Sequence, residues 1–260
     1  MKRFVIVSKD DEQSKQLKEK VNLRLIELSY ENNEENPDLV VTIGGDGTFL
    51  RAIHQYIDQL DTIKFVGIHT GTLGFFSSYD GHECEAFIQD LIDSKLEYKK
   101  FPLLDICVKS KSGNEHYYAL NEMRVENVIR TQLIRVSINN EFMETFRGTG
   151  LCISSQAGST AYNRSLGGAI LHEGLNLLQL TEITGIHHHA YRSLGSPLIV
   201  DGNTQITLES DDFCEAILCY DQLSVKLKKD SVINCMFSEK TVHCVGRPNT
   251  SYIKRLKSLF

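Results

Sequence analysis

The feature that most constrains the fold of this chain is the run from Leu39 to Leu50, LVVTIGGDGTFL. Its first five residues form an apolar, β-branched stretch, which is typical of a buried strand. Glycines then interrupt the strand, and Phe49, Leu50 and Ile53 follow at spacings that suit a helix. A strand, a glycine turn and a helix place backbone N–H groups and a helix N-terminus beside a bound anion. The run therefore predicts a phosphate-binding turn after a buried strand.

Asp46 is the one acidic residue inside this turn. A carboxylate repels phosphate, so its presence requires a role of its own. It is suited to holding a metal ion or to taking a proton from a hydroxyl group, and the simplest structural alternative is an ordinary helix N-cap. The residues alone leave all three roles open.

Composition narrows the class of protein. The chain has 260 residues, of which 41% are hydrophobic and 24% charged, enough for one large or two modest domains. A net charge of −6 argues against binding nucleic acid through phosphate contacts. We find no signal peptide and no apolar run that could span a bilayer, so we expect no membrane partner. The seven cysteines form no Cys-x-x-Cys pair, and we interpret them as buried, reduced thiols of a cytoplasmic protein.

The first hundred residues alternate between strands and helices. Strands are predicted at 4–8, 39–43 and 64–69, and helices at 9–27, from the glycine turn to about 60, and at 82–96. This alternation indicates a parallel sheet with crossover helices. The third strand also runs into glycines, at Gly71 and Gly74. Ligands of such sheets bind beyond the carboxyl ends of the strands, so the two turns are expected to face one cleft.

From about residue 97 the pattern changes to short β-like runs, which predict a mostly antiparallel half. Asn139-Asn140 has the composition of a hairpin turn. Residues 159–182 are expected to hold a helix and an irregular loop, and residues 252–260 a short amphipathic helix. The predicted strands are 103–108, 117–125, 133–139, 142–146, 151–155, 197–200, 205–208, 214–220, 223–227, 232–237 and 242–245.

We therefore predict two domains. Residues 1–100 form an α/β domain that binds the phosphates of a nucleotide, and residues 101–248 form the β domain. Residues 249–260 pack back on the first domain through the apolar side chains Ile253, Leu256, Leu259 and Phe260.

Polar and glycine residues of the β half stand where a sheet does not need them. Each group taken alone is most simply a turn, a cap or a solvated strand edge. Together they supply amides and carboxylates for ribose hydroxyls, small residues for close approach, and an aromatic ring for stacking, as an adenosine requires. The groups are Asn121-Glu122, Arg147-Gly148-Thr149-Gly150, Gly158-Ser159-Thr160-Ala161-Tyr162-Asn163, Ser165-Leu166-Gly167-Gly168 and Asp221-Gln222.

With these motifs in this order, the chain resembles the NAD kinase family, in its short bacterial form, over nearly its whole length. Gly44-Gly45-Asp46-Gly47-Thr48 alone is shared with diacylglycerol and sphingosine kinases. The specific signal is its combination with Asn121-Glu122 and Gly158–Asn163. Further matching pieces are His69-Thr70-Gly71, Leu73-Gly74-Phe75, Phe146-Arg147-Gly148, Ser165–Ala169 and Gly195-Ser196-Pro197-Leu198.

The resemblance implies a Rossmann-like α/β domain and a β-sandwich domain that holds NAD. It implies a transferase that moves the terminal phosphoryl group of ATP, with Mg²⁺ or another divalent cation, to the 2′-hydroxyl of the adenosine ribose of NAD, giving NADP. Some members also use polyphosphate. A homotetramer is common in the family. No metal-ligating residues of the chain itself are predicted.

The resemblance also assigns roles by matching position. Asp46 is implied as the general base on the 2′-hydroxyl. Asn121 and Glu122 are implied at the NAD ribose and adenine region, with Asp221 contributing from the β domain. The remaining implied nucleotide-binding residues are Gly45, Gly47, Thr48, Gly71, Leu73, Gly74, Phe75, Arg147, Thr149, Ser159, Thr160, Ala161, Tyr162, Asn163 and Ser165.

The chain departs from the family at several positions. Thr149 replaces the usual Asp, which is expected to contact the nicotinamide end or the ligand of a neighbouring subunit. The loop Ser154-Ser155-Gln156-Ala157 lacks a usual proline, and Gln222 stands where relatives can have His. His187-His188-His189 replaces an Asn-Asn-Arg stretch, and we expect a solvated loop or subunit contact there rather than a metal site.

Two other functions are weighed against NAD kinase activity. A lipid kinase on the same glycine turn needs a membrane-facing surface, and only the last nine residues, with Lys254, Arg255 and Lys257, offer one. A non-catalytic NAD(P)-binding regulator is the second alternative. Only Thr149 and the altered loop at 154–157 support it.

Overall fold

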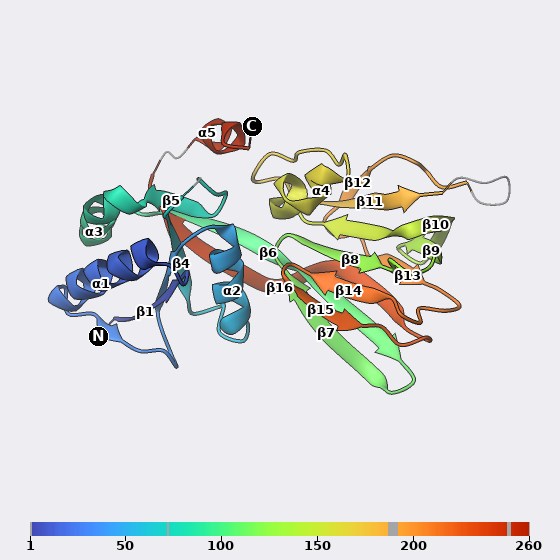
Figure 1. Ribbon diagram of the computed structural model, residues 1–260, viewed down its shortest axis with the longest axis horizontal. Coiled ribbons are helices and arrows are strands. Elements are labelled where there is room, and N and C mark those ends of the chain that lie inside the picture. The colour runs from blue at the N-terminus through green and yellow to red at the C-terminus, as the bar shows by residue number, and fades with distance from the viewer. Residues whose placement is uncertain (1, 72, 187–191, 249–250, 260) are drawn as a thin grey trace. The chain divides into compact units, whose positions relative to one another are not determined.

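The computed structural model describes residues 2–71, 73–186, 192–248 and 251–259 (Figure 1). It divides into two compact units, Met1–Phe101 with Lys240–Phe260, and Pro102–Glu239. Two long strands, β6 (Glu97–Ser110) and β16 (Val232–Gly246), carry the chain from one unit into the other. In the part of the chain that is described, no helix combines the length and the apolar character needed to cross a bilayer.

The first unit is built on a parallel sheet with the strand order β2-β1-β3-β4. Strand β5 and the end of β16 both pair in parallel with β4. β3 and β4 are buried almost throughout because their side chains are covered on both faces of the sheet, as is usual for parallel strands. The strands are β1 (Arg3–Ser8), β2 (Glu31–Asn32), β3 (Leu39–Ile43), β4 (Lys64–His69) and β5 (Ser77–Asp80).

Helices cover both faces of this sheet. α1 (Glu12–Glu27) and α3 (Cys84–Ile92) pack on the face formed by alternate residues such as Ile6 and Val41. α2 (Asp46–Gln55) contacts β1 and β3, and its Phe49 ring lies 6.0 Å from Phe65, whose side chain points to the opposite face from that of Val66. Figure 1 shows α1 and α3 on one side of β1 and β4, with α2 on the other.

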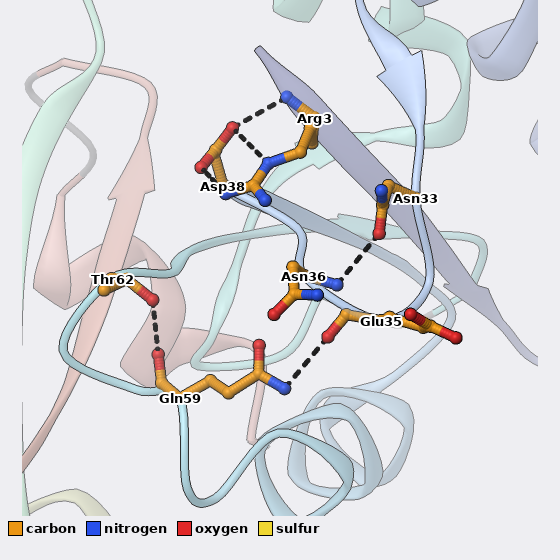
Figure 2. A network of polar contacts seen from close by, with 7 residues as sticks. All are labelled: Arg3, Asn33, Glu35, Asn36, Asp38, Gln59 and Thr62. Carbon is orange, nitrogen blue, oxygen red and sulfur yellow. Dashed lines mark hydrogen bonds and ion pairs between the residues drawn. The ribbon is translucent and has the colours of Figure 1, made fainter. Parts of the chain in front are cut away.

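A polar network fixes the connection that leads into β3 (Figure 2). Asp38 accepts hydrogen bonds from the backbone N–H of Arg3 at 2.8 Å and from its guanidinium at 2.7 and 3.2 Å. Gln59, beyond α2, donates to the carbonyl of Glu35 at 3.0 Å. These contacts lie where β1 and β3 begin, at the edge of the sheet opposite to the carboxyl ends of both strands.

The second unit is antiparallel in all of its strand pairs that the structure describes. Its main path is β15-β14-β8-β10-β9-β13-β16, with β11 pairing β10 and β12, and β7 pairing β6. A single apolar core includes Phe146, Phe213 and Leu218. The strands are β7 (Gly113–Ala119), β8 (Glu122–Glu126), β9 (Gln132–Ile138), β10 (Glu141–Ser154), β11 (Leu177–Gly185), β12 (Leu198–Asp201), β13 (Ile206–Glu209), β14 (Ile217–Tyr220) and β15 (Leu223–Lys226).

Four short helical segments complete the part of the chain that the structure describes. The 3₁₀ turns η1 (Gly81–Glu83) and η2 (Ala157–Thr160) precede α3 and α4 (Tyr162–Ser165) respectively. α5 (Tyr252–Lys257) belongs to the first unit.

The predicted fold class, an α/β sheet followed by an antiparallel β half, is confirmed. β3 and β4 have the predicted bounds, and Asn139 and Asn140 form the expected turn with φ of 50° and 68°. Two predicted pairs of strands, 142–146 with 151–155 and 232–237 with 242–245, are each one continuous strand. The single run at 117–125 is two strands, β7 and β8.

Other expectations were wrong in detail. β2 and β5 were not predicted, and β11 occupies part of the segment expected to hold only a helix and a loop. The helix after the glycine turn ends at Gln55 rather than near 60. Not all cysteines are buried, since Cys214 is exposed. Of the four apolar residues expected to hold α5 down, Leu256 and Leu259 are partly buried, Ile253 is 54% exposed, and Phe260 lies outside the described residues.

The core of the second unit gives a stability test within one strand. Phe146 is fully buried in β10, whereas Phe142 on the same strand is 60% exposed. We expect Phe146→Ala to lower the free energy of unfolding by about 3–5 kcal/mol, because it removes buried apolar surface and leaves a cavity. Phe142→Ala is the matched control and should change it by about 0.5 kcal/mol or less. Urea unfolding followed by circular dichroism measures both, and equal losses would contradict this assignment of the core.

Candidate active site

Asp46 is held by the turn that follows β4. Its carboxylate accepts hydrogen bonds from the backbone N–H groups of Phe75, at 2.9 Å to Oδ2, and Phe76, at 3.2 Å to Oδ1. The two glycine turns meet because β3 and β4 are paired up to Ile43 and Ile68. Parallel strands in register release their chains at the same sheet edge, where ligands of such sheets bind.

Asp46 is not a helix N-cap. Gly45 occupies the N-cap position of α2, and Asp46 is the first helical residue. Its carboxylate is directed across to residues 75 and 76 instead of toward the amides of its own helix. The structural alternative left open by the sequence therefore does not hold.

Gly74 makes this approach possible. A Cβ atom added at residue 74 would lie 2.1 Å from Oδ1 of Asp46, far inside van der Waals contact. Any other residue at this position would displace the carboxylate or the turn. The requirement for glycine here comes from the close packing of Asp46 and not from an unusual backbone angle.

Burial raises the pKa of the Asp46 carboxyl, and this cause is the largest. The N–H groups of Phe75 and Phe76 act against it, because they stabilise the ionised form, and so do the charges of Arg255 and His69. Asp46 is thus a partly desolvated carboxylate held by two amide donors. A group of this kind is suited to accept a proton.

The other predicted residues of the first unit lie in or next to the same two turns. Gly45 and Gly47 are exposed, and a Cβ at either would meet open space, so the backbone there is accessible to a ligand. Thr48 is buried. Gly71 is exposed and Leu73 partly buried, while Thr72, between them, lies outside the described residues.

Arg255 of α5 contacts the same turn, which the sequence did not predict. Its Nη1 donates to the carbonyl oxygen of Phe75 at 2.8 Å. Ser258 donates to the carbonyl of Leu73 at 3.0 Å. Arg255 was assigned only to a possible membrane-facing surface, and no local sequence signal distinguishes it from Lys254 and Lys257.

In the second unit, Asp221 holds the backbone at Asn121. Its two carboxylate oxygens each accept one hydrogen bond at 2.8 Å, from the N–H groups of Leu120 and Asn121. Asp221 lies in the turn between β14 and β15 with a φ of 49°. The predicted residues Asn121, Glu122 and Asp221 are therefore brought together, and the geometry of Asp221 is that of a clamp on the backbone.

The loop at 155–160 supports Asn121 from the other side. Ser155 donates its N–H to the carbonyl of Asn121 at 2.9 Å and its hydroxyl to the carbonyl of Leu120 at 2.5 Å. A Cβ at Gly158 would lie 2.0 Å from the carbonyl oxygen of Asn121, so glycine is needed for this contact. Ser159 is fully buried, and its hydroxyl accepts a hydrogen bond from the N–H of Leu171 at 3.0 Å. Ser159 therefore supports the structure of the loop.

Three predicted residues carry buried polar atoms that the described part of the protein leaves without a hydrogen-bond partner. They are Oδ1 of Asn121, Oε2 of Glu122 and Nδ2 of Asn163. An unsatisfied buried polar group costs about 1–3 kcal/mol, so it calls for an explanation such as a bound ligand or water. Two acceptors and one donor suit a ligand with hydroxyl groups.

An arginine that was not predicted completes this group. The guanidinium of Arg124 lies 3.9 Å from the ring centroid of Tyr162 and forms an ion pair with Glu126 at 2.6 Å. The N–H of Tyr162 in turn hydrogen bonds with Glu122. Arg124 lies two residues after Glu122 on β8, so the two side chains lie on the same face of the strand.

The Glu122 carboxyl has its pKa raised from 4.5 to about 7. Burial is the main cause and the negative charge of Asp221 the second, while Arg124 acts in the opposite direction. A carboxyl that titrates near neutral pH can either accept or donate a hydrogen bond to a ribose hydroxyl.

Two predicted residues are not brought to this group within one chain. Glu122 pairs with Ser154 of β10, whereas Thr149 and Arg147 lie five and seven residues back along that strand, about 16 and 23 Å away at the rise of a β-strand. Of the remaining predicted residues, Thr160 is buried, Ala161 is partly buried, and Ser165 is exposed at the end of α4.

Within residues 2–71, 73–186, 192–248 and 251–259, no group of three or more His, Cys, Asp or Glu side chains is arranged to hold a metal ion. His187-His188-His189, which we expect to form a solvated loop or a subunit contact, lies outside these residues.

Comparison with known proteins identifies the family. Residues 4–96 match the ATP-NAD kinase N-terminal domain and residues 114–246 the ATP-NAD kinase C-terminal domain. The chain is 38% identical to the NAD kinase of Geobacillus stearothermophilus, over 99% of this chain and 96% of that protein. It is 34% identical to NAD kinase 1 of Bacillus subtilis (strain 168), over 99% and 98% respectively.

Solved structures agree at the level of the fold. The yeast NADH kinase complexed with NADH is 21% identical, with a TM-score of 0.86 over 99% of this chain and 86% of that one. An NAD kinase from Archaeoglobus fulgidus in complex with ATP is 22% identical, with a TM-score of 0.78 over 99% and 98%. The chain therefore belongs to the ATP-NAD kinase family, as its motifs predicted.

The raised pKa of Glu122 predicts a pH-dependent stability. Between pH 4.5 and about 7 the folded chain keeps a proton that the unfolded chain releases, so its stability falls as the pH rises through this range. Glu122→Gln mimics the protonated side chain, so this variant does not lose stability in this way as the pH rises. We expect its stability relative to the wild type to increase across the range by up to about 3 kcal/mol.

Thermal unfolding at pH 5, 6, 7 and 8 measures this difference. Glu141→Gln, at an exposed position of β10, is the control and should follow the wild type at every pH. A constant gap between Glu122→Gln and the wild type would mean that Glu122 does not titrate in this range.

Proposed function

We infer that this chain is an ATP-dependent NAD kinase, a transferase that moves the terminal phosphoryl group of ATP to the 2′-hydroxyl of the adenosine ribose of NAD and gives NADP. Membership of the ATP-NAD kinase family supports this function over the lipid kinase and the non-catalytic regulator. The observation from the structure that carries its mechanism is the Asp46 carboxylate held by the amides of Phe75 and Phe76.

Asp46 is proposed as the general base. The 2′-hydroxyl oxygen forms a bond to the terminal phosphorus, the bond from that phosphorus to its bridging oxygen breaks, and ADP leaves with the electron pair. The hydroxyl proton passes to the Asp46 carboxylate. Phosphoryl transfer depends mainly on positioning and charge stabilisation, with little bond formation in the transition state, so a carboxylate is a sufficient base.

The open glycine turn before α2 is proposed to contact the phosphates. Gly45 and Gly47 are exposed and bear no side chains, so phosphate oxygens can approach the backbone. The amino end of α2, a helix of ten residues, favours negative charge at the same place. We assign this role to the domain 1–100 and NAD binding to the domain 101–248.

Asn121, Glu122 and Asn163 are proposed to bind hydroxyl and amide groups of NAD. Their three unsatisfied buried atoms supply two acceptors and one donor. Tyr162, with its ring fixed under Arg124, offers an aromatic face nearby. Ser159, Thr160, Ala161, Ser165 and Asp221 complete or support this pocket.

Mg²⁺ or another divalent cation is proposed to arrive with ATP. Protein-bound Mg²⁺ is commonly held by substrate phosphates, water and one or two carboxylates, so this route needs no site built from the chain's residues alone. When bound, the cation neutralises phosphate charge. The chain's own contribution is the position of Asp46 and of the glycine turn.

We propose a homo-oligomer, a homotetramer as the family resemblance implies, and the positions of Arg147 and Thr149 support a contact with a neighbouring copy. The β10 register separates them from Glu122 by about 16 Å or more, so their role at a nucleotide is more readily served in a neighbouring copy of the chain. We also propose that the protein acts in the cytoplasm.

Asp46→Asn tests the proposed base. We expect it to lower the rate of NADP formation by about 10²–10⁴-fold, because the amide cannot take the proton. NAD binding, measured by calorimetry, should be retained. The assay couples NADP formation from NAD, ATP and Mg²⁺ to an NADP-specific dehydrogenase, and a variant that keeps more than about a tenth of the wild-type rate would exclude Asp46 as the base.

Gly74→Ala tests the position of the carboxylate without changing it chemically. The new Cβ would lie 2.1 Å from Oδ1 of Asp46 and force it to move. We expect kcat to fall by about 10- to 100-fold, as is typical for a displacement of about 1 Å at a reacting group. Gly81→Ala is the control, since its Cβ would meet its nearest atom at 3.4 Å. Equal kcat values for the two variants would show that Asp46 tolerates displacement.

A further inference from the structure

Helix α5 contacts the turn that holds Asp46 at three points. Arg255 donates to the carbonyl of Phe75 at 2.8 Å, and Ser258 donates to the carbonyl of Leu73 at 3.0 Å. The ring of Tyr252 meets that of Phe75 edge to face, with centroids 6.2 Å apart. The helix and the turn belong to the same compact unit.

The orientation of α5 is unusual for a short amphipathic helix. Arg255 is only 5% exposed, whereas Ile253 on the same helix is 54% exposed. Arginine is rarely buried unless it is paired, because removing its charge from water is costly. A helix that served only to cover apolar surface would be expected to bury the isoleucine. Burial of the arginine, whose Nη1 donates to the carbonyl of Phe75, indicates that this contact helps to hold the helix on the turn.

The contact reaches Asp46 through a single peptide group. The carbonyl oxygen of Phe75, which accepts from Arg255, and the N–H of Phe76, which donates to Oδ1 of Asp46 at 3.2 Å, belong to the same planar amide. Fixing one end of this plane fixes the direction of the other. Two hydrogen bonds in series through one amide also polarise and strengthen each other.

We propose that Arg255 is a positioning residue for Asp46, which holds the Phe75–Phe76 peptide so that its N–H stays directed at the carboxylate. This inference rests on the proposed function of Asp46 as the base. The supporting structure of the active site then includes a helix about 200 residues away in the sequence, outside the motifs by which the chain resembles the family.

The charges around Asp46 agree with this arrangement. Arg255 from α5 and His69 from β4 both act to lower the pKa of the Asp46 carboxyl, while burial raises it. His69 itself is buried, with Nδ1 2.9 Å from the carbonyl of Gly71 and Nε2 3.7 Å from Asp80. Removing the Arg255 charge therefore shifts the pKa of Asp46 upward and leaves His69 in place.

The test compares Arg255→Met with Lys254→Met, which removes an equal charge from an exposed position of the same helix. In the coupled NADP assay we expect Arg255→Met to lower kcat by about 10- to 100-fold, with the KM for NAD changed by less than about threefold. The acidic limb of its kcat–pH profile should move to higher pH, because a base with a raised pKa stays protonated to higher pH. Lys254→Met should match the wild type in kcat, in the KM for NAD and in the position of the acidic limb.

Hydrogen exchange gives a readout that does not depend on turnover. Mass spectrometry of a peptide that contains residues 75 and 76 should show faster amide exchange in Arg255→Met than in Lys254→Met. If the wild type forms no NADP, the proposed function fails, and this measurement still decides whether Arg255 holds the peptide. If the wild type forms NADP, then kcat, the KM for NAD, the pH profile and hydrogen exchange together test the inference.

The inference is overturned if Arg255→Met keeps kcat within about twofold of Lys254→Met, or if kcat falls while the pH profile and the exchange of residues 75 and 76 are unchanged. Should Arg255→Met fail to fold, Arg255→Gln decides. It keeps an amide donor but loses the charge, so the acidic limb should move to higher pH with a smaller loss of kcat. An unmoved limb together with wild-type kcat and exchange would overturn the inference.

Discussion

The hydrogen bonds from Phe75 and Phe76 to Asp46 are the interaction on which the first unit depends for its chemistry. They require two turns to meet at one sheet edge, and the pairing of β3 with β4 up to Ile43 and Ile68 provides this. They also require a residue without a side chain at position 74. The parallel sheet, the glycine turns and the carboxylate are therefore one arrangement, because none of them holds the Asp46 carboxylate in this position without the others.

The second unit uses the same physical device for a different purpose. Asp221 accepts the N–H groups of two consecutive residues, Leu120 and Asn121, as Asp46 does with Phe75 and Phe76. Asp221 thereby fixes a backbone, and the unsatisfied atoms belong to the side chains of Asn121 and Glu122. Its charge has a second effect, since it helps to raise the pKa of Glu122. A clamp that orders the backbone thus also tunes the neighbouring carboxyl.

Local pattern was enough to predict the elements that have sharp physical boundaries. β3 is a short apolar run that Gly44 follows directly, and β4 is a short apolar run that starts at Lys64. Both strands have the predicted bounds. β11 was missed because Gln179 and Thr181 interrupt its apolar pattern, and their burial depends on remote partners such as the backbone of Ala169 and the side chain of Asn163. β10 continues through residues 147–150 despite two glycines because it pairs with β8, β9 and β11.

The same distinction between local sequence pattern and tertiary contact applies to the candidate site. Asp46 was predicted because it is the one acidic residue in a glycine turn, and Asn121 and Glu122 because they break an apolar alternation, which are signals within the sequence itself. Arg255 and Arg124 were not, because their roles depend on which carbonyl or ring they meet in the folded chain. A basic residue on a short helix is ordinarily solvated, so only the tertiary contact separates Arg255 from its neighbours. Arg255 is joined to the Asp46 carboxylate through the Phe75–Phe76 peptide, and this connection exists only in the folded chain.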